Sequence, residues 1–142
     1  MKKSNSKSRS DCPINYAVEL LGDKWSLIVI RDLMFKDKHR YREFLQSKEK
    51  IATNILADRL NKLEVNGFIT KSVDPDNLKS AIYNLTMKGI ELLPTMVEII
   101  KWSAMNDESS ALNNNLIAYK GRGTASVIQD IRDKLEDQLV ST

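Results

Sequence analysis

The chain has 142 residues, of which 42% are apolar and 29% charged, with a formal net charge of +3. This length favours a single domain with a real hydrophobic core, and the composition is too apolar for a disordered chain. The longest apolar run, residues 27–30, is too short to span a bilayer, and the basic N-terminus lacks the apolar stretch of a signal peptide, so we expect a cytoplasmic protein without a membrane partner.

Cysteine and histidine each occur once. A single Cys12 excludes an internal disulfide and a multi-cysteine metal site, and a single His39 argues against a zinc site and a Ser-His-Asp triad. The five glycines are scattered and form no phosphate-binding loop. We therefore expect no catalytic residue, metal or cofactor. An enzyme with Cys12 as nucleophile is disfavoured, because no histidine lies near it in the sequence.

The first ten residues are basic and rich in serine, which predicts a flexible arm. Its cations are Lys2, Lys3, Lys7 and Arg9. Solubility and contact with a DNA backbone explain such an arm equally well.

Two helices are expected next. Pro13 suits the first turn of a helix, and apolar residues at helical spacing continue to Gly22. Asp23 can cap a second helix, from Lys24 to about Phe35. This helix is apolar nearly all round, which is typical of the buried centre of a small helical domain, and Trp25 is expected to be a core aromatic residue.

A helix-turn-helix pattern follows a charged connector, residues 36–40. A short helix is predicted over residues 41–47, and residues 48–50 form the turn into a helix over about 53–66. In this arrangement the second helix enters the DNA major groove.

The second helix has two different faces. Leu56, Leu60 and Leu63 recur at helical spacing and form an apolar stripe, whereas Asn54, Asp58 and Asn61 fall on the opposite side. Thr53 and Asn54 are the residue types that cap a helix start, and the Asn-Gly pair at 66–67 is a strong stop signal. The outer face is therefore suited to contacts outside the protein.

Basic residues are concentrated in this motif, which contains eight basic and four acidic residues. Such a local excess of positive charge is expected where a protein contacts DNA phosphates. The basic residues are Lys36, Lys38, Arg40, Arg42, Lys48, Lys50, Arg59 and Lys62; the acidic ones are Asp37, Glu43, Glu49 and Asp58.

A hairpin is predicted directly after this helix, with strands over residues 68–73 and 81–85 and turn residues over 74–77. This is the position of the wing in winged-helix proteins, and Lys71 and Lys79 lie on its arms. Thr86 then begins a long helix, residues 87–105, whose apolar face is expected to form a dimer interface together with the first helix. The fold class is mainly α with a small β-hairpin wing (α+β): a winged helix-turn-helix with N- and C-terminal dimerisation helices.

Residues 106–115 are polar and predict a loop, and glycines at 121 and 123 break the chain. Residues 124–139 are an amphipathic helix, expected to pack or to be exchanged within a dimer. The expected organisation is a flexible basic arm (1–10), a winged helix-turn-helix with dimer helices (11–105) and a C-terminal extension (106–142).

These motifs together resemble the HxlR-type winged helix-turn-helix transcriptional regulators of bacteria, over residues 12–102. The resemblance rests on Cys12-Pro13, GDKWSLIVIRDL, HRYREFLQ, IATNILADRLNKLEVNGFI, IYNLTMKGIELLP and Lys101-Trp102. It implies a homodimeric DNA-binding repressor or activator, with a cysteine near the N-terminus that senses electrophiles or oxidants in some members. Ala52 stands where many relatives have a serine, so capping is expected to fall to Thr53.

We therefore expect a sequence-specific regulator that binds a palindromic operator, with recognition helices about 34 Å apart. The base-reading residues are predicted to be Thr53, Asn54, Ala57 and Asn61. The phosphate-binding residues are predicted to be Arg40, Arg42, Lys48, Lys50, Lys71 and Lys79.

Three residues leave alternatives open. Arg59 lies beside the apolar stripe and can pair internally. Asp58 would repel phosphate unless it accepts from a cytosine amine or lies off the contact. Cys12 is either a packing residue near the dimer interface or a redox sensor activated by the helix N-terminus and the basic arm. The alternative function is a winged-helix module for protein–protein contact without specific DNA binding.

Overall fold

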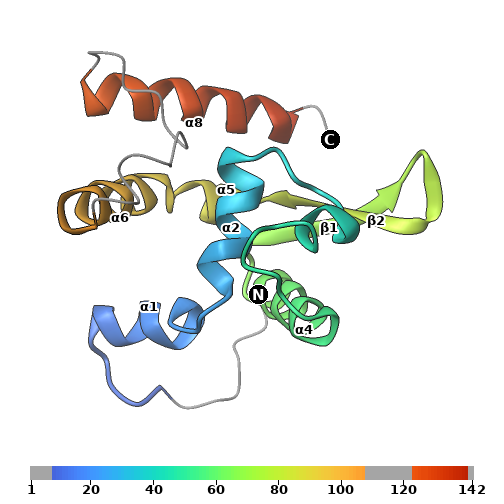
Figure 1. Ribbon diagram of the computed structural model, residues 1–142, viewed down its shortest axis with the longest axis horizontal. Coiled ribbons are helices and arrows are strands. Elements are labelled where there is room, and N and C mark those ends of the chain that lie inside the picture. The colour runs from blue at the N-terminus through green and yellow to red at the C-terminus, as the bar shows by residue number, and fades with distance from the viewer. Residues whose placement is uncertain (1–7, 108–122, 141–142) are drawn as a thin grey trace.

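The computed structural model describes residues 8–107 and 123–140. They form helices around a central α2 and one two-stranded antiparallel hairpin (Figure 1), which confirms the predicted class. The elements are α1 (Pro13–Leu21), α2 (Ser26–Phe35), α3 (Tyr41–Phe44), α4 (Thr53–Val65), β1 (Ile69–Asp74), β2 (Asn77–Leu85), α5 (Met87–Ile90), α6 (Leu93–Asn106) and α8 (Thr124–Val140).

Pro13 and Asp23 stabilise the starts of the first two helices. Pro13 occupies the first position of α1, where a missing N–H costs nothing. Asp23 stabilises the turn before α2, because its Oδ1 accepts the backbone N–H groups of Trp25 at 2.8 Å and Ser26 at 2.9 Å, but the N-cap position of α2 falls on Trp25. Residues 23–25 therefore form a turn, and α2 begins two residues later than the predicted Lys24.

The core lies between α2, α4, the hairpin and α8. The predicted leucine stripe of α4 is fully buried, as are the central residues of α2. Burial of each such side chain contributes about 1.5–3 kcal/mol. Trp25 is only half-buried and packs at the edge of this core. The least exposed aliphatic residues of these two helices are Val29, Ile30, Leu33, Leu56, Leu60 and Leu63.

The ends of α4 show one confirmed and one wrong prediction. The helix stops at Asn66, and Gly67 follows with φ +81°, which only glycine adopts without strain. The predicted cap at Thr53 is wrong. Buried Ile51 anchors an extended segment, so the N-cap position falls on Ala52 and Thr53 is already helical.

The hairpin is joined to the helix-turn-helix by backbone pairing. Its strands pair with Lys71 opposite Tyr83, and β2 begins four residues earlier than predicted. The backbone N–H of Tyr83 donates to the carbonyl of His39 at 2.8 Å, and Arg40 forms a β-bridge with Ile82. The connector before α3 therefore continues the sheet and fixes the base of the hairpin, whose tip projects from the body (Figure 1).

The long helix predicted over residues 87–105 is two helices, α5 and α6. Thr86 caps the first as predicted, accepting from the Gly89 N–H at 3.2 Å. Pro94 has no N–H to donate to the carbonyl of Ile90, so the hydrogen-bond ladder is interrupted and α6 starts anew at Leu93.

The predicted C-terminal helix is confirmed as α8, which lies against α5, α6 and β2 (Figure 1). Val127 and Leu135 are buried in the core. The polar loop predicted over residues 106–115 lies almost wholly outside the described residues. Within residues 8–107 and 123–140, no helix has the length and apolarity needed to cross a membrane.

Candidate nucleic-acid interface

The outer face of α4 is exposed and carries the residues predicted to read bases. Thr53, Asn54, Ala57 and Asn61 are all exposed, and Asn54 and Asn61 lie on the side opposite the buried leucines. Asp58 and Lys62 are charged residues on the outer face of the helix, whereas these four side chains present hydroxyl, amide and methyl groups. Such groups can donate to, accept from or pack against base edges without requiring a counter-charge.

Arg59 pairs internally, which is one of the alternatives that the sequence leaves open. Its Nε lies 2.9 Å from Oδ1 of Asp23, and its Nη1 contacts Oδ2 of Asp58. Lys62 lies one turn further, with its Nζ 3.8 Å from the same Oδ2. The hydrogen bond to Asp23 holds the pKa of Arg59 above its usual value. Two carboxylates and two cations therefore form a neutral cluster that ties α4 to the start of α2.

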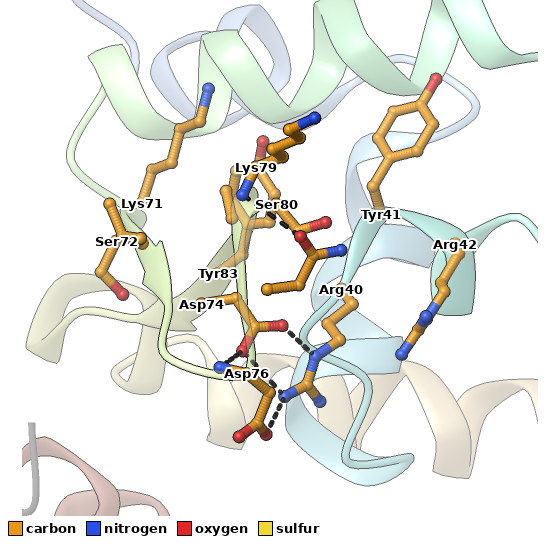
Figure 2. A pocket seen from close by; sticks show the side chains of 13 residues that line it. Arg40, Tyr41, Arg42, Lys71, Ser72, Asp74, Asp76, Lys79, Ser80 and Tyr83 are labelled. Atoms are coloured by element: carbon orange, nitrogen blue, oxygen red, sulfur yellow. Dashed lines mark hydrogen bonds and ion pairs between the residues drawn. The ribbon is translucent and has the colours of Figure 1, made fainter.

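A hollow of about 970 Å³ lies between α3 and the hairpin, and three exposed cations line it (Figure 2). These are Arg42, Lys71 and Lys79, and none of them has an ion-pair partner among the described residues. Figure 2 shows Lys71 and Lys79 extending in the same direction from the hairpin. The hollow can accept an anionic strand.

Arg40 was predicted to bind phosphate, but its guanidinium already has carboxylate partners. Its Nε lies 2.7 Å from Oδ2 of Asp74 and its Nη2 lies 3.8 Å from Oδ2 of Asp76 (Figure 2). Asp74 is buried, and its Oδ1 also accepts the Asp76 N–H at 2.9 Å. The hydrogen bond from Arg40 holds the pKa of Asp74 below its usual value. The sequence does not indicate this pair, because Asp74 belongs to a run of residues that predicts only a turn.

The turn before α4 carries Lys48 and Lys50 and is held in place by an ion pair between Glu49 and Arg31. Glu49 accepts from both terminal nitrogens of Arg31, at 2.5 and 2.9 Å, and this bond lowers the pKa of Glu49 to about 2. Lys48 and Lys50 are exposed, and Lys50 has a left-handed backbone with φ +56°.

The buried carboxylate of Asp32 holds the same turn in place. Asp32 accepts the hydroxyl of Ser47 at 2.5 Å and Nη2 of Arg31 at 2.8 Å, while Lys38 donates to Ser47 at 2.9 Å. No sequence signal indicates that Asp32 and Ser47 pair, since they are 15 residues apart and neither belongs to a recognisable motif. Together they hold the turn against α2.

Cys12 is an exposed thiol at the N-cap position of α1. A hollow of about 490 Å³ beside it is lined by Ser8, Ser10, Asp11 and Tyr16. Of the expected basic arm, only residues 8–10 are described. Arg9 donates from Nη2 to Asn15 at 2.7 Å and lies 3.4 Å from Glu19, so its charge is directed to α1.

Large apolar side chains are exposed on α1 and α6. Trp102 is 67% exposed and Ile14 is 74% exposed. In Figure 1 both helices lie on the left of the molecule, whereas the hairpin and α4 lie on the right. The other exposed apolar residues of these helices are Tyr16, Val18, Ile99 and Met105. We call this set the α1–α6 apolar surface.

The chain matches a known protein family and is similar to several known proteins. The family model described as HxlR-like helix-turn-helix matches residues 20–111. An HTH-type transcriptional regulator of Synechocystis is 33% identical over 110 residues, 78% of this chain and 81% of its own length. The HTH-type transcriptional regulator YodB of Bacillus subtilis is 34% identical over 93 residues, 65% of this chain and 82% of its own length.

Solved structures of YodB are similar to this chain. Its reduced form has a TM-score of 0.57 at 32% identity and covers 70% of this chain and 98% of its own. The quinone-bound form gives a TM-score of 0.55 at 32% identity, covering 66% of this chain and 99% of its own.

Proposed function

The chain belongs to the HxlR-like helix-turn-helix family of transcriptional regulators, and we propose that it acts as a homodimer on a palindromic DNA operator. The observation that carries this proposal is the structure of α4. Its leucine stripe is buried and its amide-bearing face is exposed, and the hairpin that follows it carries Lys71 and Lys79, which have no ion-pair partner among the described residues. A helix held in this way suits the major groove.

Two kinds of contact are proposed. Thr53, Asn54, Ala57 and Asn61 read bases, with Asn54 placed for bidentate recognition of adenine. The exposed cations bind phosphates, and so position the protein without specifying sequence. They are Arg42, Lys48, Lys50, Lys71 and Lys79. Arg40 is given a different role, because a phosphate would have to displace Asp74: it fixes the hairpin that carries Lys71 and Lys79.

We assign the α1–α6 apolar surface to the homodimer interface. It is too large a group of exposed aromatic and aliphatic side chains to be left in water without cost. It also lies away from α4 and the hairpin (Figure 1), so two protomers joined there keep both recognition helices free. A two-fold dimer then reads a two-fold symmetric site.

We also propose that Cys12 makes DNA binding responsive to oxidants or electrophiles. Its thiol is exposed at the N-cap position of α1, where oxidants and electrophiles can reach it. The related YodB has been solved in reduced, quinone-bound and diamide-treated forms. With one cysteine per chain, oxidation forms a disulfide between subunits or with a small thiol, and an electrophile alkylates the sulfur.

The experiment that tests the proposal is selection of bound duplexes from a random pool, with and without diamide, followed by titration of the selected duplex at several salt concentrations. We expect a palindromic site and an affinity that falls linearly on a logarithmic salt scale. A protein that enriches no sequence and shows no such salt dependence would instead support the protein–protein contact module.

A further inference from the structure

We propose that Asp58 is a specificity-determining residue of α4 and accepts a hydrogen bond from the exocyclic amine of a cytosine. This inference rests on the proposed function, because it assigns one base contact within the proposed interface. It also gives a role to the carboxylate that lies between Asn54 and Asn61 on the outer face of α4.

The position of Asp58 places it among the base-reading residues. Asn54 precedes it by four residues and Asn61 follows it by three, so the three side chains share the outer face of α4. The Asp58 side chain is 51% exposed. A protein that presents Asn54 and Asn61 to the major groove presents Asp58 with them.

The charge of Asp58 is neutralised before DNA arrives. A bare carboxylate near two phosphate strands would be repelled, but Oδ2 of Asp58 contacts Arg59 and lies 3.8 Å from Lys62. Arg59 is itself fixed by Asp23 at 2.9 Å, so it is a positioning residue that acts through Asp58. The neutral cluster removes most of the repulsion that would otherwise keep a carboxylate out of the groove.

The two oxygens of Asp58 have different surroundings. Both cations make their closest contact with Oδ2, and the part of the chain that the structure describes gives Oδ1 no hydrogen-bond donor. Among residues 8–107 and 123–140, Oδ1 therefore has no donor, while the contacts of Oδ2 hold the carboxylate in place. A carboxylate oxygen accepts hydrogen bonds and donates none, so Oδ1 can pair only with a donor on the DNA.

This chemistry selects cytosine among the four bases. In the major groove, guanine presents two acceptors and thymine presents an acceptor and a methyl group, so both disfavour a carboxylate. Adenine presents an amine beside the acceptor N7, whereas cytosine presents its N4 amine alone. Asp58 thus favours cytosine over adenine at one position of each half-site.

The test is selection of bound duplexes by the full chain and by Asp58→Asn. Asparagine has the same shape but also donates, and its matching base is adenine. We expect the preferred base at one position per half-site to change from cytosine to adenine, with relative affinities of the two duplexes shifting by roughly 10- to 100-fold. Other positions keep their preference.

Glu64→Gln is the matched control. Glu64 is an exposed carboxylate on the same helix, so this variant changes the net charge equally and is expected to alter the affinity for all duplexes alike. An unchanged cytosine preference in Asp58→Asn, or the same base change in Glu64→Gln, would overturn the assignment of Asp58 while leaving the proposed function in place. A wild-type protein that enriches no duplex would overturn both.

Discussion

The guanidinium of Arg40, just before α3, is bound to the buried carboxylate of Asp74 at the tip of β1, with 2.7 Å between Nε and Oδ2. This pair connects the helix-turn-helix to the turn of the hairpin, and the backbone bridge from Arg40 to Ile82 joins the same two parts. The orientation of the hairpin relative to α4 therefore depends on a side chain whose sequence context suggests a phosphate contact.

Arg40→Ala is expected to lower the melting temperature and to weaken binding to every duplex. It leaves the Asp74 carboxylate buried without its cation, and the hairpin loses its fixed orientation. The adjacent Arg42→Ala is the control, because Arg42 is exposed. That variant should have the melting temperature of the wild type. It should lower the slope of log affinity against log salt concentration by about one, as expected for the loss of one phosphate contact. Thermal unfolding and salt titration of both variants distinguish the roles; equal melting temperatures would contradict the structural role of Arg40.

Asn54→Ala is expected to cost about 1–3 kcal/mol of affinity for the selected operator and to relax its specificity at one base pair. Asn54 is exposed on α4 and its removal leaves no buried group unpaired, so the melting temperature should not fall. Lys71→Ala provides the comparison: a phosphate contact is lost equally on all sequences. The measurement is the affinity for the operator and its single-base variants, and a uniform loss in Asn54→Ala would refute the base-reading role.

Local sequence signals predicted much of the fold, because the features concerned depend on neighbouring residues. The leucine spacing of α4, the stop at Gly67 and the Thr86 cap are of this kind. The break between α5 and α6 has a local signal in Pro94, but the apolar pattern continues past Pro94 and favours one long helix. The cap at Ala52 depends instead on where buried Ile51 holds the chain.

The sequence predicts which residues of the candidate site are exposed, but it does not predict the buried ion pairs and hydrogen bonds that hold them in place. Exposure of Asn54 and Asn61 follows from the helical periodicity of α4 alone. The partners of Arg40 and Asp32 lie 34 and 15 residues away in sequence. No spacing rule links residues so far apart, so only the folded arrangement shows that Asp74 and Ser47 bind them.

Acidification is expected to destabilise the protein between about pH 4.5 and pH 2. Burial opposes ionisation of Asp23, but hydrogen bonds from Ser26, Trp25 and Arg59 lower its pKa from 3.8 to about 2. Arg31 lowers the pKa of Glu49 from 4.5 to about 2. Because both values are lower in the folded state, the stabilisation is present above the unfolded pKa and is lost as pH falls through the folded one.

Each of these two carboxylates is expected to contribute on the order of 1 kcal/mol near neutral pH, after allowance for solvent screening. Denaturant unfolding of Asp23→Asn and Glu49→Gln measures this contribution. Each variant should be less stable than the wild type at pH 6 and nearly equal to it at pH 2. A constant difference across that pH range would show that ionisation of the carboxylate is not the cause.

Trp102→Glu is expected to dissociate the dimer. Trp102 is the largest exposed side chain of the α1–α6 apolar surface, and loss of an aromatic anchor costs about 2 kcal/mol or more, which is roughly a thirtyfold weaker association. Leu78→Glu makes the same kind of change on the hairpin, where Leu78 is 80% exposed, and should leave the mass unchanged. Sedimentation equilibrium measures both; a dimeric Trp102→Glu would place the interface elsewhere.

Cys12→Ser is expected to abolish the response of DNA binding to diamide and to a quinone. In the wild type, two Cys12 thiols give two protons and two electrons to diamide and join as a disulfide between subunits, whereas a quinone forms a carbon–sulfur bond with one thiolate. Because Cys12 is the only cysteine, the serine variant has no other thiol to react. Operator affinity before and after treatment, together with the mass on a non-reducing gel, separates these routes. If the variant loses operator binding on treatment as the wild type does, the response arises outside Cys12 and the thiol has no sensing role.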